Sequence, residues 1–263
     1  MITFTSTPER VGVGVGAGVD SGEVIVRAAW AGGRTVIREL SGVQPWRPRI
    51  VSRPGRVATV ALVSTRASLI AGDDVHLSVS VGPGAVLELV ELGATLAHDA
   101  RSGPPATIQT SLTVEPGGAL IWCGEPLIAA SGCDALRTTA AEVGFGGRLL
   151  LGDTVVLGRS RERPGGISAR TRIVCDGVPL IDETLDTRDL DTLGSAVVMG
   201  GRRLLRSLML AGVLDDDPPE GSLRAHGPGM LWRSFEPAES DLAGVAARWR
   251  ALVLGDTAGA EVA

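Results

Sequence analysis

Carboxylates in two turns are the side chains of this sequence whose types and positions could do chemistry. Asp73 and Asp74 follow Gly72, and Glu162 lies in an arginine-rich stretch that begins at Arg159. Carboxylate oxygens can hold a divalent cation weakly and release it, whereas soft thiolates hold transition metals more firmly. Aspartate also favours turns, because its side chain bonds to nearby backbone groups. These positions therefore have two interpretations, a transient oxygen-rich cation site and ordinary turn formation.

A tight metal site has no support in the spacing of the other ligand types. No histidine lies two to five positions from another histidine or a cysteine, and no Cys-x-x-Cys pair occurs. Zinc and copper sites need such close ligands. We therefore expect no tightly bound cofactor, and the uneven number of cysteines indicates reduced thiols in a cytoplasmic protein. The residues concerned are His76, His98, His226, Cys123, Cys133 and Cys175.

Motifs of two common enzyme classes are incomplete. The glycines at positions 12, 14, 16 and 18 have the wrong spacing for a dinucleotide-binding loop and no helix follows them, so a glycine-rich strand or arm is expected there. The Gly-x-Ser-x-Gly motif of serine hydrolases is absent. We therefore predict that the chain is not an enzyme.

The composition limits the kinds of partner. Acidic residues outnumber basic ones by 30 to 25, which gives a formal net charge of -5 and argues against a nucleic-acid binder. No segment is as long and apolar as a membrane span, and the first residues do not resemble a signal peptide. We expect a cytoplasmic protein that binds neither nucleic acid nor membrane.

Three stretches repeat the theme that must position the carboxylate turns. Residues 81–89, 114–122 and 143–151 each run from a valine through a glycine-rich turn into an apolar segment. A spacing of about 30 residues indicates stacked β-units, each of which buries an apolar face against the next. The sequence therefore predicts a mainly β fold, a β-helix-like stack of strand-turn-strand units.

The flanking segments extend this stack. Residues 22–27 and 34–40 read as an opening hairpin, and the apolar run 57–63 reads as a strand buried on both faces. A second hairpin is expected across Asp176-Gly177, which separates two apolar runs.

The last part of the chain has a different pattern. Residues 195–214 are compatible with a helix, residues 215–221 form a loop, and a helix with one apolar face follows the cap Ser240-Asp241 and covers residues 242–253. We predict one domain over residues 1–263, in which a β stack (1–190) carries a small helical C-terminal part (191–263).

Several short motifs follow one another in a characteristic order. They are the run 65–74, the Pro-Gly-Ala and Pro-Gly-Gly-Ala turns, the run 157–162, and the ending 227–233 with its tryptophan-bearing helix. In this order they resemble the UreD (also called UreH) family of urease accessory proteins. The resemblance covers roughly residues 46–254, and the order of the motifs carries it, because each motif alone is short.

The resemblance implies a chaperone that delivers nickel to urease. Family members form a β-helix-like stack, bind apo-urease and form a complex with UreF and the GTPase UreG, and nickel is thought to pass through a channel inside the UreD protein. The resemblance thus implies that the protein binds nickel only while passing it on and holds no resident metal. It also allows the protein to form a homodimer within the complex.

The family's motif residues carry over to five positions. Gly72 and Asp73 match the end of the family's Gly-Gly-x-x-Gly-Asp turn, and Gly158, Arg159 and Glu162 match its Gly-Arg…Gly-Glu loop. We expect Asp73 and Glu162 to line the nickel path and Arg159 to order its loop by a charge-assisted contact. Serine, leucine and Arg161 replace the family's other glycines, so the chain reads as a divergent member. The alternatives are a cupin-like β-roll enzyme, whose His-x-His pair is absent, and a protein-interaction scaffold without a metal role.

Overall fold

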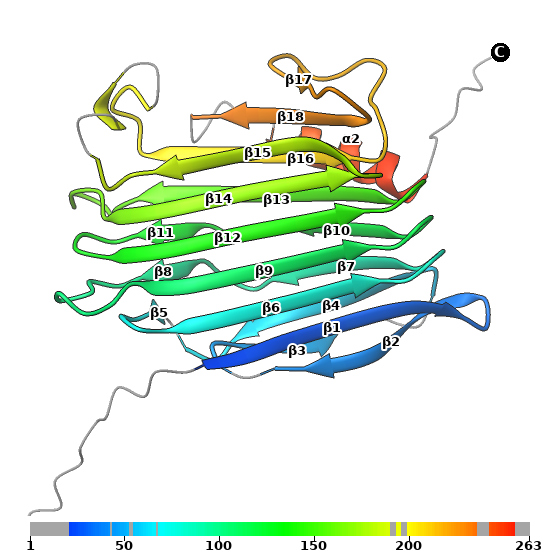
Figure 1. The fold of residues 1–263 in the computed structure, drawn as a ribbon, viewed down its shortest axis with the longest axis horizontal. Helices are drawn as coiled ribbons and strands as arrows, with labels where there is room; N and C mark the ends of the chain where they lie inside the picture. Colours follow the sequence, from blue (N-terminus) through cyan, green and yellow to red (C-terminus); the bar gives the residue numbers. More distant parts are fainter. Residues whose placement is uncertain are drawn as a thin grey trace, which may run out of the picture.

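Two β-sheets lie face to face and form most of the molecule (Figure 1). The computed structural model describes residues 21–42, 44–52, 55–66, 68–189, 193–195, 199–235 and 242–255. Within these residues, one sheet has seven strands in the order β15-β14-β12-β9-β6-β1-β2, and the other has eleven. The predicted glycine-rich segment 11–19 and the helix cap Ser240-Asp241 lie outside the described residues.

The predicted strand-turn-strand units are confirmed, and they wind as a β-solenoid of about four turns. In each unit one strand joins the seven-stranded sheet and the next joins the eleven-stranded sheet, and equivalent strands of successive units pair in parallel. The units are β6 (Asp74–Val81) with β7 (Val86–Glu91), β9 (Ala106–Val114) with β10 (Ala119–Cys123), and β12 (Asp134–Val143) with β13 (Arg148–Leu157).

The glycine turns have the same geometry in all three units. The third residue of each turn is a glycine with positive φ, at 71° for Gly84, 72° for Gly117 and 66° for Gly146. The backbone N–H of the fourth residue donates to the carbonyl of the first. Proline precedes the glycine in two of the turns, as in type II turns, where only a residue without Cβ accepts this φ at low cost. The repeated sequence theme is therefore a repeated turn.

The flanking predictions are also confirmed. Antiparallel hairpins are formed by β1 (Ser21–Ala31) with β2 (Arg34–Ser41), and by β14 (Gly166–Cys175) with β15 (Val178–Asp186). Asp176 and Gly177 have φ of 49° and 76°, the left-handed values that a two-residue hairpin turn needs. The eleven-stranded sheet is completed by β3 (Trp46–Ile50), β4 (Val57–Ser64), β5 (Ser68–Leu69), β8 (Thr95–Ala97), β11 (Leu127–Ala129), β16 (Leu204–Ala211), β17 (Leu223–Arg224) and β18 (Gly229–Ser234).

One expectation was wrong. Within residues 195–214, which we expected as a helix, residues 204–211 form strand β16. The strand lies antiparallel between β13 and β18 and fills the edge that β13 would otherwise leave open. A short apolar run has no clear period, so local pattern cannot separate a buried strand from a helix, and the available sheet edge decides.

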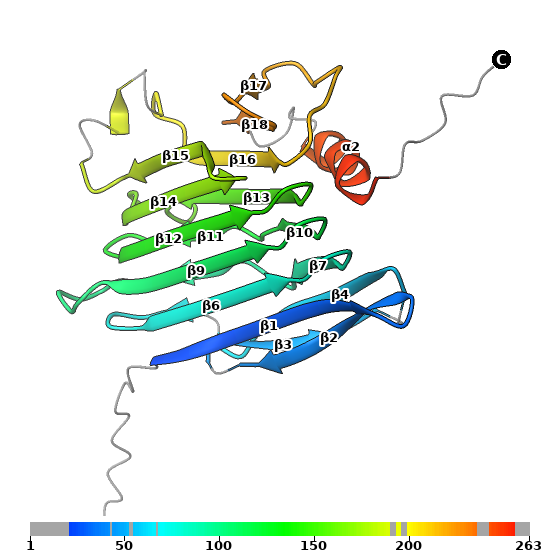
Figure 2. The ribbon, with the colours of Figure 1, turned by 45° about the vertical axis from the view of Figure 1, so that its right-hand side comes forward.

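The predicted C-terminal helix is confirmed as α2 (Leu242–Leu254). Figure 2 shows it on the outer face of the eleven-stranded sheet, where Val245, Trp249 and Val253 are buried against the outward side chains of that sheet. The main core lies between the two sheets. No helix among the described residues is long and apolar enough to cross a membrane.

Candidate functional site

A column of polar residues crosses the inner face of the eleven-stranded sheet. Ten residues after the valine that begins each repeat, the chain has Glu91 in the first repeat, Gly124 in the second and Asp153 in the third. The parallel register, which pairs Trp122 with Leu89 and Cys123 with Gly152, brings these positions level in neighbouring strands. Towards the C-terminal edge the column continues, because Asp153 pairs with Ser207 and Ser207 with Arg233.

A second column faces it from the seven-stranded sheet. Thr110 pairs with Thr139, Thr139 with Thr171, and Thr171 with Glu183. The three threonines are buried, so their hydroxyl groups lie in the space between the sheets. Arg137 lies two residues before Thr139 and therefore points to the same side of its strand. The interior thus carries two facing rows of polar groups, one on each sheet.

Three adjoining cavities follow these columns. The central cavity, of about 60 Å³, shares Asp153 and Thr171 with a cavity of about 270 Å³ near β18, which we call the β18-side cavity. It shares Trp46 and Thr95 with a cavity of about 180 Å³ near β5, the β5-side cavity. The cavities therefore form a row along the stack, perpendicular to the strands.

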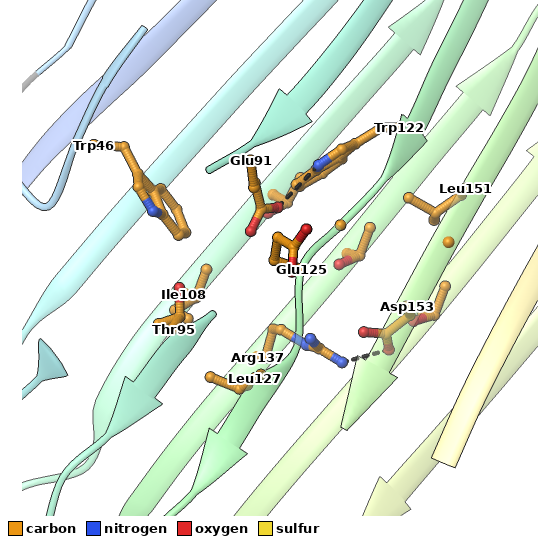
Figure 3. A pocket seen from close by; sticks show the side chains of 15 residues that line it. Trp46, Glu91, Thr95, Ile108, Trp122, Glu125, Leu127, Arg137, Leu151 and Asp153 are labelled. Carbon is orange, nitrogen blue, oxygen red and sulfur yellow. Dashed lines mark hydrogen bonds and ion pairs between the residues drawn. The ribbon is translucent and has the colours of Figure 1, made fainter. Parts of the chain in front are cut away.

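The carboxyl group of Glu91 lies inside the central cavity (Figure 3). It accepts a hydrogen bond of 2.9 Å from the indole N–H of Trp122. Burial raises the pKa of Glu91 to about 7, although this bond, the backbone N–H of Glu125 and the charge of Arg137 act in the opposite direction. Gly124 leaves room for this group, since a Cβ there would stand 3.1 Å from the Glu91 Oε1.

Two ion pairs cross the interior from one sheet to the other. Arg137 of β12 binds Asp153 of β13, and both side chains are largely buried, with 14% and 25% of their surface exposed. In the β18-side cavity, Arg233 of β18 binds Glu183 of β15 and also donates to the Ser207 Oγ at 3.1 Å. The Arg137–Asp153 pair stands where the central and β18-side cavities meet.

The side-chain oxygens along this row of cavities suit weak contacts with a cation and do not form a closed metal-binding site. The side-chain groups that could contact a cation are carboxylate and hydroxyl oxygens, which are hard ligands of modest affinity for first-row metals. No group of three or more histidine, cysteine, aspartate or glutamate side chains that could hold a metal occurs in the described part of the chain. A cation would therefore meet one or two oxygen ligands at a time.

A comparison with protein families shows to which family the chain belongs. The family model described as UreD urease accessory protein matches residues 20–261. The chain belongs to the UreD family. Urease accessory protein UreD 1 of Streptomyces griseus subsp. griseus is 39% identical over 225 residues, which cover 84% of this chain and 88% of that protein. Urease accessory protein UreD 1 of Saccharopolyspora erythraea is 32% identical over 79% of this chain and 80% of that protein.

These relatives confirm the resemblance seen in the sequence. They are named as accessory proteins of urease and not as enzymes, in agreement with the prediction of a non-enzymatic role. The prediction rested on the order of motifs, and the family match covers the same stretch and extends beyond it at both ends.

The UreD turn residue Asp73 is buried, not displayed at a turn tip. Its Oδ2 accepts a 2.8 Å hydrogen bond from the backbone N–H of Ile70 and an ion-pair contact from Arg66, and Gly72 before it has φ of 81°. Its other oxygen, Oδ1, is buried and accepts no hydrogen bond from the described residues. Arg66 lines the β5-side cavity, so Asp73 stands one side chain away from that end of the row.

The UreD loop residues Arg159 and Glu162 form the predicted contact. Arg159 Nε donates to Glu162 Oε1 at 2.9 Å, and this hydrogen bond is the main reason that the pKa of Glu162 falls to about 2. Gly158 has φ of 75°, and Arg203 closes the loop by donating to the Glu162 carbonyl at 2.6 Å and the Leu157 carbonyl at 2.7 Å. The loop is thus ordered by arginine contacts from both sides.

The structure does not bring Asp73 and Glu162 into one site. Asp73 directly precedes β6 and Glu162 lies before β14, and β9 and β12 separate these two strands in the sheet. Three strand spacings amount to about 14 Å. Their role on a nickel path stays a prediction.

The interior groups Glu91, Arg137 and Asp153 were missed in the sequence. The sequence could have indicated them, because each repeat can be extended by two residues. The extended repeats then end on Glu91, Gly124 and Asp153, at equivalent positions. The threonine row has a weaker signal, since threonine is common on both faces of strands.

Proposed function

We propose that this UreD family member is a nickel-delivery chaperone that works in the cytoplasm with UreF, UreG and apo-urease, and that nickel crosses it through the row of interior cavities. The central and β18-side cavities support the proposal most directly, because oxygen donors from both sheets line them in register. The proposal leaves room for a homodimer within the complex.

Weak oxygen ligands suit an ion that must move on. A site of thiolates or several imidazoles would hold nickel too firmly to pass it to urease. Facing carboxylates and hydroxyls instead offer successive weak contacts, from Glu91 past Thr139 to Asp153 and then Glu183. Asp73 and Glu162 stay proposed contacts outside the row of cavities, at two separate places, and Asp73 adjoins the β5-side cavity through Arg66.

A plugging substitution tests the interior path. Gly124→Val places a branched side chain against Glu91 Oε1 and Trp122 Nε1, inside the central cavity. We expect urease co-produced with this variant, UreF and UreG to contain severalfold less nickel, measured by metal analysis of the purified enzyme. Gly194→Val is the matched control, because no atom of the described residues lies within 4 Å of a Cβ at Gly194.

Two further measurements make the outcome decisive. Thermal unfolding and co-purification of the variant with its partners show whether the fold and the complex persist. Full nickel loading of urease by a folded Gly124→Val protein would rule out the interior path. Equal nickel content of urease with and without the wild-type chain would rule out nickel delivery itself and favour a scaffold role.

A further inference from the structure

We propose that Arg137 acts as a counter-cation fixed to the protein. Its guanidinium group pairs with the Asp153 carboxylate when no metal ion is present. It thereby prevents that carboxylate from retaining a metal ion that moves along the interior path. The inference rests on the proposed function and adds a positioning residue to it. Arg137 acts through Asp153 and is not itself a ligand of the cargo.

The position of the pair supports this role. Arg137 reaches from β12 across the space between the sheets to Asp153 on β13, and Asp153 lines both the central and the β18-side cavity. Any ion that moves between these cavities passes the Asp153 carboxylate. An ion that contacts this carboxylate must displace a guanidinium group that is covalently held beside it.

The charges along the row indicate why such a group is needed. Asp153, Glu91 and the rim residue Glu125 line the central cavity together, and Arg137 is the cation that lines it with them. Without Arg137, the cavity would present the Asp153 carboxylate, with Glu125 at its rim and a partly ionised Glu91 nearby, to a divalent cation with no competing charge. In partly buried surroundings, attraction between opposite charges is stronger than in water, so the ion would be held. The arginine makes occupation of Asp153 an exchange of one cation for another.

The same arrangement recurs one step further along the path. Arg233 of β18 pairs with Glu183 of β15 in the β18-side cavity, again from one sheet to the other. This pair is more exposed, with 28% and 36% of the side-chain surface accessible, against 14% and 25% for Arg137 and Asp153. Solvent screens an exposed pair more strongly, so Arg137 is the dominant counter-cation.

The test measures retention of Ni²⁺ by the isolated full-length chain. Arg137→Gln removes the charge but keeps an amide N–H that can donate to Asp153, so the carboxylate is not left without a donor. The protein is incubated with Ni²⁺, desalted and analysed for bound metal. We expect the wild type to retain little and Arg137→Gln to retain about one equivalent, with apparent affinity increased at least tenfold in a titration, a factor that corresponds to about 1.4 kcal/mol.

Three companion variants separate this role from a structural one. Arg137→Lys keeps a positive charge and should restore release, which loss of packing alone would not do. Arg137→Gln combined with Asp153→Asn removes the carboxylate as well and should return retention to the wild-type level. Arg233→Gln should increase retention less than Arg137→Gln does, because its pair is more exposed.

The outcomes distinguish this inference from the proposed function. Retention by folded Arg137→Gln no greater than that of the wild type would overturn the counter-cation role, whatever urease contains. Retention that persists in the double variant would also overturn it, because the ion would then be bound elsewhere. Failure of nickel delivery itself is measured separately, by the Gly124→Val experiment on urease.

Discussion

At the scale of single residues, the environment of each carboxyl group determines what it can do. Glu162 is held by Arg159 and ionised over a wide pH range, since this contact lowers its pKa to about 2. Glu91 lies in the central cavity, where burial raises its pKa to about 7. The two groups share a side-chain type, but at neutral pH Glu162 is fully ionised and Glu91 only partly so, because one faces a guanidinium group and the other a desolvated interior.

Glu91 should make the stability of the protein fall as pH rises. Its folded-state pKa lies above the ordinary value, so the contribution of the neutral acid is fully present below about pH 4.5 and is lost as pH rises through about 7. Glu91→Gln keeps an acceptor for Trp122 and carries no charge. We expect this variant to exceed the wild type in unfolding free energy at pH 8 by an amount on the order of 2 kcal/mol, and to match it near pH 4.5.

Urea unfolding at several pH values measures this difference. Glu142→Gln, on the exposed face of β12, is the matched control and should not change the slope. A wild-type curve parallel to that of Glu91→Gln between pH 4.5 and 8 would show that Glu91 does not titrate in this window.

At the scale of elements, a buried carboxylate adds a polar anchor to the apolar packing of helix α2 on the stack. Asp215 is 1% exposed and accepts two 2.6 Å hydrogen bonds from Arg248, together with one of 3.0 Å from the Trp249 indole. Trp249 is itself fully buried beneath the helix. Asp215 therefore links the loop that follows β16 to two consecutive side chains of the terminal helix.

Replacing Asp215 should loosen α2 without unwinding the solenoid. Asp215→Ala leaves the buried Trp249 N–H and the Arg248 guanidinium without their acceptor, and loss of such a charged hydrogen-bond partner costs about 2–3 kcal/mol. We expect a lower urea midpoint and faster amide exchange within Leu242–Leu254, with the exchange of β9 and β12 changed much less. Asp216→Ala, at the exposed neighbouring position, serves as the control, and equal exchange of α2 in both variants would contradict the anchoring role.

At the scale of the whole molecule, the solenoid carries its turns along two sides and its polar columns between them. The glycine turns, which follow β6, β9 and β12, lie along one side of the stack, and the turns that lead into β6 and β14 and hold Asp73 and Glu162 lie along the other (Figure 1). Arginines hold these two carboxylates in their turns, whereas the central cavity lies between the sheets. A route through the molecule must connect these turns with the cavity.

Asp73 and Glu162 are tested together at this scale. The double variant Asp73→Asn and Glu162→Gln keeps the shape of both side chains, and the amide oxygen introduced at position 73 can still accept the Ile70 N–H. We expect urease matured with it to contain less nickel while the partner complex still forms, and metal analysis of the purified urease measures this. Full activation of urease would remove both residues from the mechanism, whereas the alanine variants would confound it, because Asp73 is a buried partner of Arg66.

Much of the fold follows from local sequence. The three glycine turns, the Asp176-Gly177 hairpin and helix α2 could be predicted because turn geometry and helical amphipathicity depend on residues close in the chain. Strand β16 could not, because its residues pair with β13 across 48 to 62 positions of sequence, from Val156–Leu204 to Leu149–Ala211, and only the open sheet edge selects a strand over a helix.

The sequence by itself determined the stacked β-units, the family and the charge-assisted contact of Arg159 with Glu162, since each depends on short-range pattern or on motif order. Only the tertiary structure decided that Asp73 is buried, that Glu91, Gly124 and Asp153 form one column, and that Arg137 reaches Asp153 from the opposite sheet. The physical reason is register. Which side chains meet inside a solenoid depends on how strands distant in sequence align, and this alignment is set by the packing of the whole stack.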